Sequence, residues 1–295
     1  MRKLKFWISA GACLWCLASP AVNPYVAGNE NSVAESVPAA SVSWSPIAMD
    51  SVSAHEQKLV KKKHLLEFTL NVQLPAAEEK LADPVRAWWL ALLTGQTGIE
   101  PDGPLTSGDE VSTYFRKAYM DRGRDEITQL VRETRRDTLD HRFNYAFDMT
   151  LTRVYETKRF VTFRAETYAY SGGAHGVQYR EYATFRKSDG HLVSWRDLIE
   201  PRQQTKFSTL VVDGLEDYFG VVGFAALSER LQITDSYSRT SFPLPKGNPG
   251  LLEDGLCVQY DAYEIAPYAA GQPLAIVPYA SMKRLWSKVG LSLWK

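Results

Sequence analysis

A glycine-rich segment around one histidine is the first part of the sequence in which side chains could do chemistry. Residues 170–176 read YSGGAHG, so three glycines and one alanine fall within five positions and leave the backbone free of bulky side chains. A histidine in such a loop can bind a ligand, or its ring can hydrogen-bond a buried carbonyl or carboxylate. The alternative is a tight connection between two strands in which His175 is a structural residue. Both interpretations stay open, and Tyr170 and His175 are candidate binding residues.

A second segment, residues 260–271 (YDAYEIAPYAAG), gathers carboxylates and phenol rings. Asp261 and Glu264 are of the types that form an acid/base pair, because proton transfer needs two groups with separated pKa values. Tyr263 and Tyr268 carry rings that stack on a sugar or on an apolar side chain of a partner. The alternative is a proline-fixed loop whose tyrosines pack on a sheet and whose Glu264 caps backbone N–H groups. These four residues complete the set of candidate binding residues.

The rest of the sequence contains no familiar catalytic or cofactor motif. It lacks the serine-hydrolase elbow, the two-histidine zinc motif and a phosphate-binding glycine loop. None of the five histidines has a second histidine or a cysteine at metal-ligand spacing. Cys257 lies in an apolar run, which is typical of a buried, inert thiol. We therefore expect no metal and no cofactor.

The elements that position these segments follow from hydrophobic periodicity. Residues 66–74 alternate apolar and polar side chains and predict a strand with one buried face. Two helical stretches follow, at about 83–93 and 109–139, and Gly123 is expected to break the second. Four strands of an antiparallel meander come next, at 143–151, 160–170, 179–186 and 191–193.

The C-terminal part mixes short strands and helices. Ser194 and Asp197 have the spacing of a capping box before a helical turn. The remaining predicted elements are a helix at 205–219, strands at 256–260 and 274–277, and a closing helix at 280–289. The fold class is therefore α+β, an antiparallel sheet with helices packed on one face, in one domain or two intimate lobes. We expect an α/β subdomain over 59–150 and an α+β domain over 151–295 that carries both loops.

The N-terminus has the organisation of a secretory signal. Three basic residues precede an apolar run at 6–18, and small residues predict cleavage after Ala21. The run is shorter than the roughly 20 residues that span a bilayer, although an uncleaved anchor remains an alternative. The residues before Cys13 and Cys16 fit a lipoprotein signal poorly. We expect a periplasmic or extracellular protein whose residues 22–58 form a flexible tether.

The overall charge of the chain argues against polyanionic partners that are bound through bulk charge. The chain has 34 Lys+Arg and 34 Asp+Glu. Removal of residues 1–21 takes away three basic and no acidic residues, which leaves 31 against 34, a net charge of −3. Such a chain does not bind nucleic acid or an anionic membrane through bulk charge.

The two loop segments resemble a known family. The tyrosine and glycines of 170–176, followed by Asp189-Gly190 and the segment 195–199 (WRDLI), resemble the extracytoplasmic domain of unknown function of the lysozyme-sensing anti-sigma factor V. Residues 263–271 and the pair Pro278-Tyr279 are similar to its distal motif, so the resemblance covers about 168–286. Residues 65–148 more weakly resemble the domain that precedes it, which also precedes the catalytic domain of a peptidoglycan deacetylase.

The resemblance implies a domain pair that works in the cell envelope. The chain shows neither a sigma-binding region nor a deacetylase domain, so the resemblance implies recognition rather than either activity. The leading hypothesis is a non-enzymatic module that binds a lysozyme-like protein or cell-wall peptidoglycan. One alternative is an envelope hydrolase that uses Asp261, Glu264 and His175. A second alternative is a structural or inhibitory envelope protein without a ligand.

Overall fold

The computed structural model describes residues 44–134, 143–232 and 237–294. The predicted signal peptide (1–21) and the predicted tether from 22 to 43 lie outside these residues. The tether was expected to reach residue 58, and this is wrong, because a strand, β1 (Met49–Val60), begins at Met49. Only Val52 and Val60 of this strand are buried, and the strand therefore needs few apolar residues. Its sequence shows little of the alternation of apolar and polar residues that predicts a strand.

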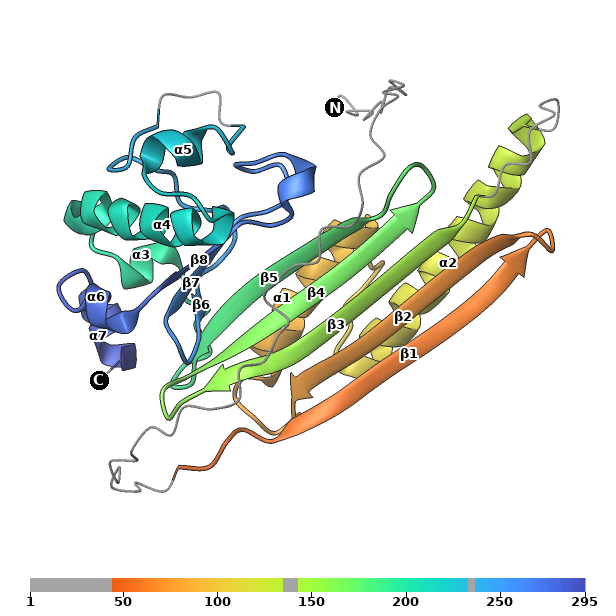
Figure 1. The fold of residues 1–295 in the computed structure, drawn as a ribbon. Helices are drawn as coiled ribbons and strands as arrows, with labels where there is room; N and C mark the ends of the chain where they lie inside the picture. Colours follow the sequence, from red (N-terminus) through yellow and green to blue (C-terminus); the bar gives the residue numbers. More distant parts are fainter. Residues whose placement is uncertain (1–43, 135–142, 233–236, 295) are drawn as a thin grey trace, which may run out of the picture. The chain divides into compact units, whose positions relative to one another are not determined.

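A five-stranded sheet forms the larger part of the fold (Figure 1). Its strands follow one another across the sheet in chain order. They are β1, β2 (His64–Pro75), β3 (Tyr145–Glu156), β4 (Phe160–Ser171) and β5 (Val177–Arg186). All neighbours are antiparallel except β2 and β3, which are parallel because two helices carry the chain back across the sheet between them.

The predicted α+β class is confirmed, and two details of the sheet differ from the prediction. The sheet is mixed rather than purely antiparallel. Residues 191–193 were expected to form a fourth strand of the meander, but Leu192 makes only an isolated bridge to Phe185. The sheet also reaches Arg186, so the domain boundary predicted at residue 150 falls inside β3.

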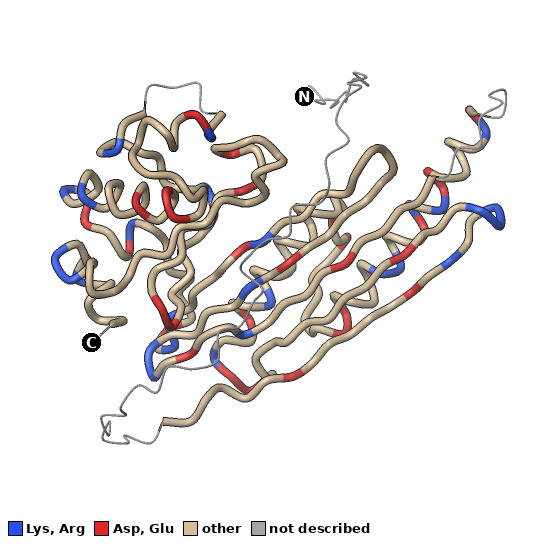
Figure 2. The backbone as a smooth tube through the Cα atoms, in the orientation of Figure 1, with Lys and Arg blue, Asp and Glu red and all other residues tan. Residues whose placement is uncertain are grey.

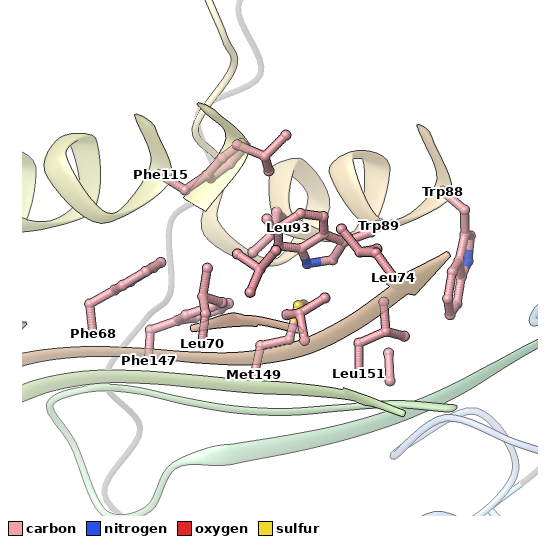
Figure 3. Close-up of a cluster of buried hydrophobic side chains, with 14 of the residues drawn as sticks. Phe68, Leu70, Leu74, Trp88, Trp89, Leu93, Phe115, Phe147, Met149 and Leu151 are labelled. Carbon is pink, nitrogen blue, oxygen red and sulfur yellow. The ribbon is translucent and has the colours of Figure 1, made fainter. Parts of the chain in front are cut away.

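Two helices, α1 (Ala82–Thr97) and α2 (Gly108–Glu133), cover one face of this sheet (Figure 1). Figure 3 shows the apolar side chains that they bury against the strands, and Leu70, Trp89, Phe115 and Met149 are among them. The helix α2 runs unbroken through Gly123, contrary to the prediction. A Cβ at this position would lie 2.5 Å from Leu66 Cδ1, so glycine here permits close helix–sheet packing.

A second lobe is built around a three-stranded sheet with its own apolar core. The strands are β6 (Gly250–Leu251), β7 (Leu256–Gln259) and β8 (Leu274–Val277). The helical segments are α3 (Trp195–Leu198), η3 (Pro201–Gln203), α4 (Gln204–Phe219), α5 (Phe224–Ser228), η4 (Tyr268–Ala270), α6 (Tyr279–Met282) and α7 (Lys288–Trp294). The capping box at Ser194 and Asp197 is confirmed.

The predicted closing helix is instead two short helices. The chain leaves the helix after Met282, so that Trp286 forms a β-bridge with Ile199 and Ser287 N donates to Leu198 O at 2.7 Å. Tertiary hydrogen bonds thus override the helical periodicity of 280–289.

Buried hydrogen bonds join the two sheets. Thr162 Oγ1 donates to Leu251 O at 2.6 Å, and Leu251 N donates to Thr184 Oγ1 at 3.0 Å. Both threonines are fully buried. Because an unpaired polar group at such a position is costly, these contacts fix the second lobe on β4 and β5. Among the described residues, no helix combines the length and the apolar character needed to cross a bilayer.

Candidate functional site

The two loops singled out from the sequence lie in direct contact. The first joins β4 to β5 (172–176), and the second joins β7 to β8 (260–273). The rings of His175 and Tyr268 stack with centroids 4.2 Å apart, and Tyr268 Oη donates to Gly176 O at 2.6 Å. The ring of Tyr263 stacks on the ring of Tyr268, with centroids 5.6 Å apart. We call His175, Tyr268 and Tyr263 the ring stack.

Small residues shape the β4–β5 loop. Gly172 and Gly173 adopt φ angles of 87° and 98°, a region that side chains rarely allow. A Cβ at Gly176 would lie 2.4 Å from the ring of Tyr168. Tyr170 Oη donates to Gly173 O at 2.9 Å and closes the loop. Tyr170 therefore holds the loop, and His175 is left exposed beside it.

The β7–β8 loop is held by the carboxylate of Glu264. Its oxygens accept hydrogen bonds from Lys246 N at 2.8 Å and Asp261 N at 2.9 Å. The structure thus supports the capping interpretation of Glu264. Tyr263 has a positive φ of 67° and is 64% exposed. Backbone strain of this kind costs about 1–3 kcal/mol and is concentrated at functional sites.

A small polar pocket of about 80 Å³ opens next to Asp261. Its lining comes from α1, β4, β5 and the β7–β8 loop, and it is made of Leu92, Gln96, Ala165, Thr167, Tyr179, Arg180, Glu181 and Asp261. Burial raises the pKa of Asp261, and the negative charge of Glu264 raises it further. Burial also raises the pKa of Glu181, although a long hydrogen bond from Trp88 Nε1 opposes this shift.

The pocket and the ring stack adjoin one another. Burial raises the pKa of Tyr179, and electrostatic interactions with Asp261 and Tyr268 add to the rise. Tyr179 therefore lies within electrostatic reach of one residue from the pocket and one from the stack. The β7–β8 loop contributes Asp261 to the pocket and Tyr263 and Tyr268 to the ring stack. We call the pocket and the ring stack together the loop surface, which can pack on a flat apolar face and accept hydrogen bonds from a ligand.

Of the six predicted residues, five lie in or around this surface with distinct roles. His175, Tyr263 and Tyr268 make the stack, Asp261 lines the pocket, and Glu264 caps the loop that presents them. Tyr170, the sixth, closes the neighbouring loop. That any of them binds a ligand stays a prediction.

The sequence interpretation missed Tyr179 and Glu181. Both belong to the face of β5 that turns toward the helices, together with Ala183 and Phe185. A carboxylate in that otherwise apolar series was the available signal, because an inward-facing Glu needs a partner or a cavity.

Other chemistry finds less support in the structure. Burial raises the pKa of Cys257 to about 12, which removes it as a thiolate nucleophile. Within residues 44–134, 143–232 and 237–294, no three His, Cys, Asp or Glu side chains are grouped to hold a metal ion.

Fold and loops together define a two-lobed α+β protein whose lobes share one loop surface. Residues 56–178 match the family described as "Deacetylase PdaC", and residues 197–280 match the family described as "Protein of unknown function (DUF3298)". The family resemblance predicted from the sequence is therefore confirmed. The β4–β5 loop lies in the first match and the β7–β8 loop lies in the second, so the loop surface contains residues from both matched regions.

Two solved structures share the fold. One is a DUF3298 family member from Bacteroides fragilis, with a TM-score of 0.68 and 19% identity, over 83% of this chain and 95% of that chain. The other is a DUF3298 family protein from Pseudomonas aeruginosa PAO1, with a TM-score of 0.59 and 16% identity, over 83% of this chain and 96% of that chain. At these identities the likeness concerns the fold alone. No curated protein matches the chain.

Proposed function

We propose that the protein is an exported binding module of the cell envelope that recognises a lysozyme-like protein or a cell-wall glycan. The observation that carries this proposal is the ring stack, in which two loops far apart in the sequence present the exposed rings of His175 and Tyr263, both packed on the half-buried ring of Tyr268. Aromatic faces of this kind pack on sugar rings and on the apolar side chains of partners.

The strain at Tyr263 supports the same proposal. Its left-handed backbone lifts a large apolar ring into solvent, where the ring gains little from burial in the free protein. A strained, exposed aromatic residue is explained when a ligand covers it in the bound state.

Export follows from the sequence rather than from the described residues. The basic and apolar N-terminus predicts a signal peptide. The matched families are a deacetylase family and a family of unknown function, and the envelope setting is our extension of the first description to this chain.

The hydrolase alternative has weaker support. Asp261 has a raised pKa and Glu181 shares its pocket, which is the environment of a general acid. Glu264, however, uses both carboxylate oxygens to hold backbone N–H groups, so it is not free to exchange a proton with a substrate. The structure thus favours recognition over catalysis by Asp261, Glu264 and His175.

Retention on immobilised lysozyme and on insoluble peptidoglycan tests the proposal. The Tyr263→Asn variant removes the exposed ring with a residue that tolerates a positive φ, so we expect it to stay folded and to lose most retention. Val222→Asn removes an apolar side chain that is 94% exposed and remote from the loops in sequence, and it should be retained like the wild type. If the wild type is retained on neither material, the structural or inhibitory alternative takes the place of this proposal.

A further inference from the structure

The turn between β1 and β2 is built from three consecutive lysines. Val60 pairs with His64 across the turn, and Lys63 N donates to Val60 O at 3.2 Å. Lys61 and Lys62 lie between them with φ angles of 52° and 63°. Glycine and asparagine are the residues that suit this left-handed conformation. A turn with lysine at both positions is therefore strained, and glycine or asparagine at these positions would relieve the strain.

The turn concentrates positive charge at one place on the protein. Lys58, Lys61 and Lys62 are exposed, and none of them forms an ion pair with any other residue whose position the structure describes. No Asp or Glu occurs between Glu56 and Glu67, and Glu56 is paired with Arg116 of α2. Figure 2 shows the turn in blue at the end of the β1–β2 hairpin. A chain with almost no net charge thus carries a local basic cluster.

An apolar side chain stands beside these lysines. Leu59 is 60% exposed and lies opposite Leu65 on the face of the sheet that turns away from α1 and α2. Most large apolar residues of this sheet are buried under the helices, so an exposed leucine at the hairpin end is an exception. A leucine flanked by lysines matches the interface of an anionic bilayer, where lysines meet the headgroups and the apolar side chain enters between them.

We propose that the β1–β2 turn is a contact site for an anionic phospholipid surface. Lys58, Lys61 and Lys62 supply the attraction to headgroup phosphates, and Leu59 favours a bilayer over a soluble polyanion, which has no apolar region to receive it. This site is distinct from the loop surface that the two lobes share, and it acts through local rather than bulk charge. A single cluster of this size gives weak, salt-sensitive binding that orients the protein on the surface.

Co-sedimentation of the full chain with vesicles tests the proposal. The vesicles contain either phosphatidylcholine alone or phosphatidylcholine with 30% phosphatidylglycerol, and the ratio of the two affinities is compared between variants. The ratio of each variant is divided by the ratio of the wild type. The contribution of the apolar residues 6–18 then cancels, because it is the same in every variant. We expect the wild type to prefer anionic vesicles and to lose the preference at high salt.

Two variants separate charge from folding. Lys61→Asn with Lys62→Gly removes two charges while giving the turn residues that suit positive φ, so the variant should melt no lower than the wild type. Its preference for anionic vesicles should fall about 25-fold, since each of the two lysines near such a surface contributes about a factor of five. Lys283→Gln with Lys288→Gln removes two exposed lysines of the second lobe and should change nothing. Equal loss in both double variants, or no loss in the first, overturns the proposal.

The Leu59→Ser variant distinguishes a bilayer from a soluble polyanion. We expect it to weaken vesicle binding and to leave binding of inorganic polyphosphate unchanged. If Leu59→Ser sediments with anionic vesicles like the wild type, while polyphosphate competes fully with the vesicles, the turn binds polyanions in general and the bilayer proposal is wrong.

Discussion

Two turns at the same end of the five-stranded sheet reverse the chain in opposite ways. Leu66 pairs with Tyr145, and Tyr145 pairs with Ser171, so the β1–β2 turn and the β4–β5 loop share this end. The β4–β5 loop uses Gly172 and Gly173 where φ is positive. The β1–β2 turn uses lysines at positions where φ is also positive.

The difference between the two turns lies in what surrounds them. The β4–β5 loop is fixed by hydrogen bonds from Tyr170 and from Tyr268 of the other lobe, so its geometry is stabilised from both sides. The lysine turn has its own strand pairing and one backbone hydrogen bond across its base. A relaxed loop with many contacts suits the presentation of a ring stack, whereas a strained and exposed turn suits direct contact with a surface.

The largest expected effect comes from removing the contacts between the β4–β5 loop and the second lobe. Tyr268→Ala removes the hydrogen bond to Gly176 O and two ring contacts, each worth about 1 kcal/mol. We expect a loss of about 2–3 kcal/mol in the free energy of unfolding, measured with urea, together with loss of ligand retention. Tyr268→Phe keeps the rings and should lose only about 1 kcal/mol.

Some features behind these expectations were accessible from the sequence. The alternation in residues 66–74 predicted β2, and the composition of the two loops marked them as unusual. The strand β1 escaped prediction because an edge strand with two buried side chains has almost no apolar alternation. The contact between His175 and Tyr268 spans 93 positions, and no local pattern encodes such a distance.

Two further failures have the same physical origin. Gly123 is a poor helix former, but its missing side chain lets Leu66 approach α2, and this packing outweighs the helix propensity. Glu181 was passed over because its role depends on α1 and the β7–β8 loop, which enclose the pocket around it. Local periodicity thus predicted the elements, and tertiary packing decided the site.

Exchanging turn residues should give effects of opposite sign in the two turns. Lys62→Gly relieves the left-handed strain and should raise the free energy of unfolding by about 1 kcal/mol. Gly172→Ala places a side chain at a φ of 87° in open space, and strain alone should lower stability by about 1 kcal/mol. Gly95→Ala, in the exposed part of α1, is the matched control and should stabilise the protein by about 0.5–1 kcal/mol. A loss of stability in Lys62→Gly would show that the turn is not strained by its lysines.

The smallest expected effect is a pH dependence of stability that comes from Glu181 in the pocket and has no counterpart at the β1–β2 turn. Burial raises the folded-state pKa of Glu181 above its unfolded value of about 4.3, so between these two values the folded state binds more protons than the unfolded state. Stability therefore falls as pH rises through this window, and Glu181→Gln should remove that fall.

Urea unfolding of Glu181→Gln from pH 4 to pH 8 measures this effect. The variant should gain stability relative to the wild type as pH rises and approach it near pH 4. Glu78→Gln changes an exposed carboxylate and should follow the wild type throughout, as should Lys61→Asn with Lys62→Gly apart from a constant offset. If Glu181→Gln and Glu78→Gln have the same pH profile, burial in the pocket does not govern Glu181, and the carboxyl groups next to the ring stack act as ordinary surface charges.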